Sequence, residues 1–284
     1  MATEVGKVAS LWRYPVKSMQ GEELSDSEVT QHGLLGDRVY ALIDVAEGKA
    51  ASAKNPVKWP TLFGCKSLFA EPPKKGAAPP AVKITLYDGS TTSSPERDCH
   101  QILSKALKRT VILAVADRGW MSGVHATLPP TWTGKAEQYW PDVAGLDRRD
   151  TVTEFTLPRG TFFDGATVHL ITLATLITLH RVYPKGRFEP LRFRPNILVA
   201  TPEDVQGFVE QSWIGKTVKI GEVQLAITGS TGRCVMTTLA QGDLPKDNGI
   251  LRTAVQQNEG NVGVYAQVVQ GGTVKRGDRV LVGG

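Results

Sequence analysis

The sequence predicts an α+β fold that is mainly β and has two parts, with a small antiparallel barrel or sandwich at the amino end. Short apolar runs bounded by Gly or Pro fill the first ninety residues, a second set of strand patterns follows residue 163, and only a few stretches have helical periodicity. The 284 residues are enough for two domains with their own cores.

The amino-terminal part has the pattern of strands separated by turns rather than by helices. We predict strands at residues 5–16, 37–44, 65–70, 81–88 and 111–116. A helix is predicted over residues 94–109, because Ser94 suits the N-cap and Pro95 the first helical position.

The carboxyl-terminal part predicts further strands around three helices. The strands are expected at residues 167–172, 193–200, 216–228, 234–239, 262–269 and 279–282, and the helices at 174–182, 204–213 and 250–257. We therefore divide the chain into an amino-terminal domain (1–117), a connecting segment (118–163) and a carboxyl-terminal domain (164–284).

The connecting segment has little periodicity and holds Trp120, Trp132, Trp140 and the Pro129-Pro130 pair. A loop this long typically marks a lid, a binding loop or an inter-domain connection. We predict that it forms part of a substrate entrance; the alternative is a surface excursion held by its tryptophans.

Composition excludes several classes of protein. With 41% hydrophobic and 21% charged residues the chain is neither disordered nor fibrous. It lacks an apolar run of ~20 residues and a secretory signal pattern, so we expect a cytoplasmic protein without a membrane partner. The net charge of +5 is dispersed, which argues against nucleic acid as a partner. Its three cysteines have no metal-cluster or disulfide spacing.

The sharpest motif is TGSTGRC, residues 228–234, between two predicted strands. Its glycines allow a tight turn that presents N–H groups to an anion, Thr231 adds a hydroxyl and Arg233 adds a guanidinium. The same cation favours the thiolate of Cys234, the form that binds soft metals. The alternative is a plain turn followed by a small buried cysteine.

Three other segments carry polar groups at strand ends. Lys17 and Ser18 follow the first strand, where they either reach an anionic ligand or are solvated. Asp164 is a lone carboxylate in FFDGA, a sequence that also suits an ordinary turn. His169 lies in an apolar strand and is interpreted as a core histidine.

The sequence RFRPN places Arg192, Arg194 and Asn196 at alternate positions. In a strand, alternate side chains share one face, so these residues form either a donor face for phosphate or a polar heterocycle, or an exposed basic edge.

Together these segments resemble a known family. LWRYPVKSMQG, GLLGDRVYALID, FFDGATVHLITLATL, RFRPNILVA, TGRCVMTTL and VKRGDRVLV occur here in the same order as in the MOSC proteins with an amino-terminal β-barrel domain. That group includes the mitochondrial amidoxime-reducing components and bacterial relatives that reduce N-hydroxylated bases. The resemblance extends over nearly the whole chain, and it implies an amino-terminal β-barrel-like domain and a carboxyl-terminal β-barrel with peripheral helices.

The resemblance implies a molybdenum cofactor (molybdopterin) whose metal has one protein ligand, Cys234. The residues it assigns to cofactor binding are Lys17, Ser18, Arg38, Thr172, Arg194, Asn196, Thr231, Gly232 and Arg233. Asp164 matches a carboxylate near the metal and is assigned to proton handling or substrate orientation. The chain departs from the amidoxime reducers at Gly165 and Ala166, where they carry hydroxyl groups.

The function so implied is reduction of N-hydroxylated or N-oxide compounds by oxygen-atom transfer to molybdenum. An external electron-transfer protein is implied as a partner, because the chain lacks flavin, haem and iron–sulfur signatures. One alternative is a cofactor carrier or a sulfur relay through a Cys234 persulfide. Another is a metal-free barrel with a buried Cys234.

Overall fold

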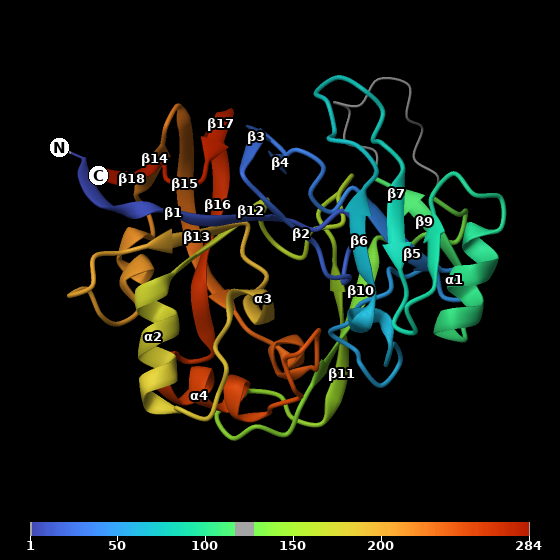
Figure 1. Cartoon of the computed structure of the whole chain (residues 1–284). Helices are drawn as coiled ribbons and strands as arrows, with labels where there is room; N and C mark the ends of the chain where they lie inside the picture. Colours follow the sequence, from blue (N-terminus) through green and yellow to red (C-terminus); the bar gives the residue numbers. More distant parts are fainter. Residues whose placement is uncertain (1, 117–127, 284) are drawn as a thin grey trace.

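Strands build both lobes of the molecule, and the longer helices lie at its periphery (Figure 1). The computed structural model describes residues 2–116 and 128–283. The predicted fold class, α+β and mainly β, is confirmed. No helix in these two ranges has the length and apolarity needed to cross a lipid bilayer.

Within the described residues, seven strands close into a barrel, because β13 pairs with β12 on one side and with β1 on the other. In order around the ring they are β13 (Ile197–Ala200), β12 (Val168–Thr172), β16 (Asn261–Gln270), β15 (Val223–Gly232), β14 (Thr217–Ile220), β18 (Arg279–Gly283) and β1 (Thr3–Arg13). A short strand, β2 (Glu22–Leu24), continues the sheet from β1. Alternate apolar side chains such as Val218, Ile220 and Leu225 fill the interior.

Helices support the barrel on one side. The parallel pair β12–β13 is joined by α2 (Leu173–Val182) and α3 (Pro190–Phe193), as a parallel pair requires a crossover. The remaining elements here are η2 (Val209–Trp213), η3 (Val235–Thr238) and α4 (Gly249–Asn258). Helices α2 and α4 pack together through Leu179, Ile250 and their neighbours.

The second lobe consists of small antiparallel sheets around its own core. Its elements are β5 (Tyr40–Asp44), η1 (Leu62–Gly64), β6 (Lys66–Phe69), β7 (Val82–Thr85), β8 (Thr91–Ser93), α1 (Cys99–Leu107), β9 (Val111–Val115), β10 (Lys135–Trp140) and β11 (Thr151–Thr156). Cys65 and Cys99 are buried in this core.

The two lobes are interlocked by strands from opposite ends of the sequence. β1 lies in the predicted amino-terminal range but closes the carboxyl-terminal barrel. A small sheet joins β17 (Gly272–Lys275) to β3 (Asp26–Thr30) and β4 (Gly33–Leu34). The domain boundaries at residues 117 and 163 stay a prediction. Strand β1 does not follow them, because it lies before residue 117 and yet belongs to the carboxyl-terminal barrel.

Two helix predictions were placed wrongly. The helix predicted from Ser94 begins at Cys99 with Asp98 at its N-cap, because the backbone and hydroxyl of Ser94 are bonded to Val82 in the neighbouring strand. The helix predicted at 204–213 is the 3-10 turn η2 alone.

The connecting segment is more regular than predicted. Its described part contains the hairpin β10–β11, paired from Lys135↔Thr156 to Trp140↔Thr151. A bridge between Ala50 and Ala136 adds this hairpin to the second lobe. Trp120 lies outside the described residues. The hairpin was missed because its two strands, KAEQYW and TVTEFT, contain few apolar residues and therefore lack a clear alternation of apolar and polar positions.

Candidate functional site

A cleft with both lobes in its walls gathers most of the predicted site residues. It encloses about 640 Å³ including its solvent-open part. Its lining residues, which define the inner cavity, are Lys17, Ser18, Arg38, Lys54, Asp164, His169, Arg192, Phe193, Arg194, Thr231, Gly232, Arg233, Cys234, Met236, Thr237 and Tyr265. Of the predicted set, Thr172 and Asn196 do not line it.

The inner cavity is strongly cationic. Six lysine and arginine side chains line it, against the single carboxylate of Asp164. Burial lowers the pKa of both Arg194 and Arg233 to about 10, so both remain charged at neutral pH. Buried cations in such excess fit an anionic ligand.

Asp164 is held between two lysines. Its carboxylate forms ion pairs with Lys17 and, at 3.0 Å, with Lys54. Burial alone would raise the pKa of this carboxyl, but the two ammonium groups hold it well below its usual range. Of the two roles predicted for Asp164, proton handling and substrate orientation, its ionised and paired state favours orientation.

Lys17 lies at the end of the turn after β1 and is buried. Its ammonium also donates to the carbonyl of Phe162 at 3.0 Å and lies 5.9 Å from the ring of Phe155. Burial lowers its pKa from 10.5 to about 8, although Asp164 opposes that shift.

This pKa predicts how stability depends on pH. Between pH 8 and 10.5 the unfolded chain binds more protons at Lys17 than the folded protein, so the free energy of unfolding rises with pH across this window. We expect Lys17→Met to remove that rise. Urea unfolding of the cofactor-free wild type and variant at several pH values measures it; parallel pH profiles would contradict the assignment.

Two arginines face the ring of the buried Tyr14. The guanidinium carbon of Arg194 lies 4.1 Å from the ring centroid and that of Arg38 4.9 Å. Both residues have left-handed backbone angles, φ of +52° and +50°, which turn their side chains toward the cavity wall. Arg38 pairs with the buried Asp37, and Arg194 donates to the Met19 carbonyl at 2.5 Å.

The tight glycine turn predicted at residues 228–234 does not form, because residues 228–232 are the end of strand β15 and pair with β16. Cys234 follows this strand, and its neighbour Arg233 holds the segment in place. The Arg233 guanidinium donates to the carbonyls of Val262 at 2.8 Å and Phe193 at 3.0 Å, and contacts the His169 ring. Cys234 is partly exposed to the cavity, unlike Cys65 and Cys99. The strand predicted at 234–239 is instead η3, because the hydroxyls of Thr237 and Thr238 bond back to the carbonyls three residues earlier.

The predicted strand 193–200 begins only at Ile197. Arg192 belongs to the helical turn α3, and Arg194 follows it, so the expected shared face of Arg192, Arg194 and Asn196 does not form. Pro190 at the start of α3 favours this helical turn.

Asn196 and Thr172 bond within the fold rather than facing the inner cavity. The Asn196 amide donates to Asp37 at 3.0 Å and its carbonyl accepts the His169 N–H. Thr172 caps α2 and donates to the buried carboxylate of Glu210 at 2.8 Å. Both hold neighbouring parts of the fold in place without lining the inner cavity, and their assignment to cofactor binding stays a prediction.

Thr231 is the polar group that most clearly lacks a partner. It is 1% exposed, lines the inner cavity, and its hydroxyl has no hydrogen-bond partner among the described residues. A buried hydroxyl left without a partner costs about 1–3 kcal/mol, so a ligand oxygen at this point would satisfy it. Ser18, by contrast, accepts the Ala53 N–H at 3.1 Å.

Sequence reasoning missed Lys54 and underestimated His169. Lys54 lies in an irregular loop, and nothing in ASAKNPVKWP distinguishes it from a solvated lysine. His169 is 5% exposed, as expected of a core residue, yet its ring lines the inner cavity beside Arg233. Burial, with Arg233, lowers the pKa of this imidazole, which keeps it neutral.

Gly263 lets β16 pass close to His169. Its φ is +85°, and an added Cβ would lie 2.4 Å from His169 Nε2 and 2.5 Å from the Leu170 carbonyl oxygen. Gly89 is the matched control, because its φ is +87° with nothing within 4 Å. We expect Gly263→Ala to lower the free energy of unfolding by about 2 kcal/mol more than Gly89→Ala. Equal losses in denaturant unfolding would exclude a steric effect.

Two family models match the sequence. The MOSC domain matches residues 158–281, and the MOSC N-terminal beta barrel domain matches residues 5–68. The chain therefore belongs to the MOSC domain proteins of the kind that carries an N-terminal β-barrel domain, and the resemblance inferred from the motifs is confirmed.

Particular relatives are similar over most of the chain. Human mitochondrial amidoxime reducing component 2 is 26% identical over 247 residues, covering 83% of this chain and 67% of the relative. The rat protein of the same name is 24% identical over 249 residues, with the same coverage. Among solved structures, the YUAD protein from Bacillus subtilis aligns with a TM-score of 0.46 and 13% identity, over 99% of this chain and 98% of that one.

Proposed function

We propose that this protein is a molybdenum-cofactor-dependent reductase of N-hydroxylated or N-oxide compounds. The observation that carries the proposal is a half-exposed cysteine, Cys234, in a cavity whose walls hold six cations and one carboxylate. Kinship with the amidoxime reducing components supports it.

The residues present fit a molybdopterin. Its phosphate and dithiolene are anionic, which suits the lysines and arginines of the inner cavity, and the unpartnered Thr231 hydroxyl offers a donor. Cys234 supplies the soft thiolate that molybdenum prefers. Among the described residues no group of three or more His, Cys, Asp and Glu could hold a metal by itself, so the pterin would supply the other sulfur ligands.

When bound, the cofactor supplies the two-electron chemistry that removes oxygen from nitrogen. Overall, two electrons and two protons convert the N–OH group to N–H and water. The chain's cations lower the energy of the anionic cofactor, and Asp164 orients Lys17 and Lys54 without giving up a proton. Electrons come from an external redox protein, which the basic surface favours when that partner is acidic.

The test is elemental analysis together with turnover. Purified protein should hold about one molybdenum per chain and reduce benzamidoxime with reduced viologen as the electron donor. Protein without molybdenum or turnover, but with a persulfide on Cys234 by mass spectrometry, would overturn the proposal and favour the sulfur-relay alternative.

A further inference from the structure

A second cavity opens beside the inner cavity and meets it at the thiol. The two share Lys54, Gly232, Arg233 and Cys234. The remaining lining residues of this outer cavity are Gln138, Trp140, Gly145, Leu146, Asp147, Glu259 and Gly260. A ligand in the outer cavity would therefore reach Cys234 without contacting Arg38, Arg192 or Arg194, which line the inner cavity alone.

One wall of the outer cavity is the hairpin β10–β11, which holds Trp140 in a fixed orientation. The Trp140 indole N–H donates to the hydroxyl of Thr153 on the paired strand at 2.8 Å, and the ring is half-buried. A half-buried indole whose N–H is already bonded offers its face, a surface suited to a flat ring.

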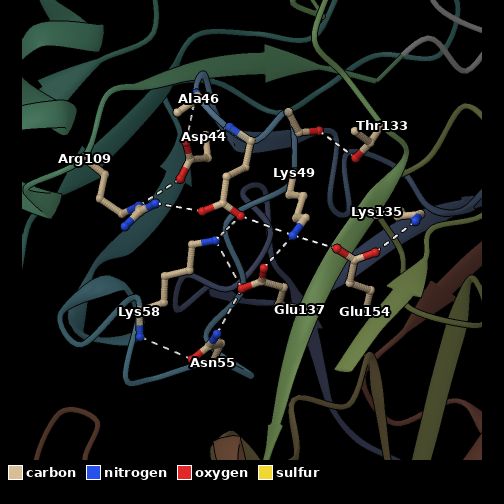
Figure 2. Close-up of polar contacts among 12 residues, drawn as sticks. Asp44, Ala46, Lys49, Asn55, Lys58, Arg109, Thr133, Lys135, Glu137 and Glu154 are labelled. Atoms are coloured by element: carbon tan, nitrogen blue, oxygen red, sulfur yellow. Dashed lines mark hydrogen bonds and ion pairs between the residues drawn. The ribbon is translucent and has the colours of Figure 1, made fainter. Parts of the chain in front are cut away.

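A charged network anchors that hairpin to the loop that carries Lys54. Glu137 on β10 accepts from Lys49 at 2.7 Å, Lys58 at 3.1 Å and Asn55 at 3.0 Å (Figure 2). Asn55 follows Lys54 directly, and the Lys54 carbonyl accepts the Tyr139 N–H at 2.8 Å. The wall with Trp140 and the loop with Lys54 thus form one rigid unit.

Lys54 is the cation at the junction of the two cavities. Its ammonium lies 3.0 Å from an Asp164 oxygen and 4.6 Å from the ring centroid of Phe155, and its side chain is 17% exposed. An ammonium has three donors, so the Asp164 pair leaves capacity for a further acceptor.

Charge differs between the two cavities. The inner cavity is cationic, whereas the lining of the outer cavity includes two exposed carboxylates, Asp147 and Glu259. Neither forms an ion pair within the two described ranges. The outer cavity therefore suits a neutral or cationic ligand better than the inner cavity does.

We propose that the outer cavity is the substrate subsite: Trp140 stacks on a planar ring, and Lys54 donates a hydrogen bond to the oxygen bound to nitrogen. The inference deepens the proposed function and rests on it for the identity of that oxygen. It assigns aromatic N-hydroxylated compounds as the preferred substrates over aliphatic ones of the same reactive group.

The first test compares benzamidoxime with acetamidoxime, which share the reactive group and differ in the ring. For Trp140→Leu we expect kcat/KM for benzamidoxime to fall about 10-fold and that for acetamidoxime to change little. Trp140→Phe should keep most of the wild-type ratio of the two kcat/KM values. Molybdenum content should be unchanged, since Trp140 does not line the inner cavity. Trp132→Leu, in the same segment but outside this cavity, should leave the ratio unaltered. An unaltered ratio in Trp140→Leu would overturn the stacking assignment.

The second test isolates the oxygen by equilibrium binding. Benzamidoxime and benzamidine differ in the N-bound oxygen, and quenching of tryptophan fluorescence gives both dissociation constants without turnover. We expect Lys54→Met to lower the preference for benzamidoxime about 10-fold and Lys54→Arg to restore part of it. A loss of molybdenum with an unchanged preference would place Lys54 with the cofactor and overturn the assignment.

Binding also separates this inference from the proposed function. Should wild-type protein hold molybdenum but reduce neither amidoxime, the proposed reductase activity fails. If benzamidoxime quenches the tryptophan fluorescence of the wild type but not that of Trp140→Phe, the quenched residue is Trp140 and the subsite is supported. Quenching that persists unchanged in Trp140→Phe would reject the subsite.

Discussion

Cys234→Ser is expected to lower both molybdenum content and benzamidoxime reduction at least ~100-fold, because losing a residue that merely orients a metal ligand already costs about 10–100-fold. The serine oxygen is a harder ligand and remains protonated at neutral pH, so it replaces a thiolate poorly at a soft metal. The free energy of unfolding of the cofactor-free protein should change by less than about 1 kcal/mol, since Cys234 is partly exposed.

Cys99→Ser is the matched control. Cys99 is buried in the core of the second lobe, so its loss should cost stability and leave molybdenum bound. Metal analysis and viologen-linked turnover of both variants measure the contrast. A Cys234→Ser protein that keeps its metal and full activity would reject Cys234 as the ligand.

Arg192→Met should cause a large loss of stability. Arg192 is 1% exposed and donates to four carbonyls: those of Arg187, Thr237, Leu239 and Pro245, at 2.8–3.3 Å. Each buried acceptor left without a donor costs about 1–3 kcal/mol, so we expect the free energy of unfolding to fall by about 4 kcal/mol. Two of these carbonyls belong to the turn after Cys234, so molybdenum retention should fall as well.

Arg187→Met separates burial from charge. Arg187 is exposed and pairs with Glu189 and Asp243 at the surface, so its loss should cost no more than about 1 kcal/mol. Denaturant unfolding of the two variants gives the comparison. Similar losses would mean that the carbonyl contacts of Arg192 contribute little to stability.

Local sequence was enough to predict three site residues, Cys234, Arg233 and Lys17, because each lies at a strand end within a recognisable motif. Arg233 and Cys234 follow strand β15 and Lys17 follows β1, and all three line one cavity. The structure after Cys234 could not be predicted in this way. VMTTL has strand-like β-branched residues, but hydroxyl bonds of Thr237 and Thr238 to the backbone favour a 3-10 turn.

Site residues that are positioned by tertiary contacts could not be predicted from the sequence. Arg192 and Arg194 alternate like strand neighbours, yet Arg192 is in a helical turn and Arg194 has a positive φ. Lys54 comes from a loop without periodicity, and only the contact of that loop with β10 places it beside Asp164. A single sequence contains no local signal for such a juxtaposition.

The pairing of β1 with β18 has a consequence for how the chain folds during its synthesis. Thr3 lies opposite Val282, so all the residues between these two strands must be synthesised before the strands can pair. Contacts so distant along the chain slow folding and leave a strand edge exposed meanwhile. Nascent chains would thus depend on protection from aggregation until β18 has emerged from the ribosome.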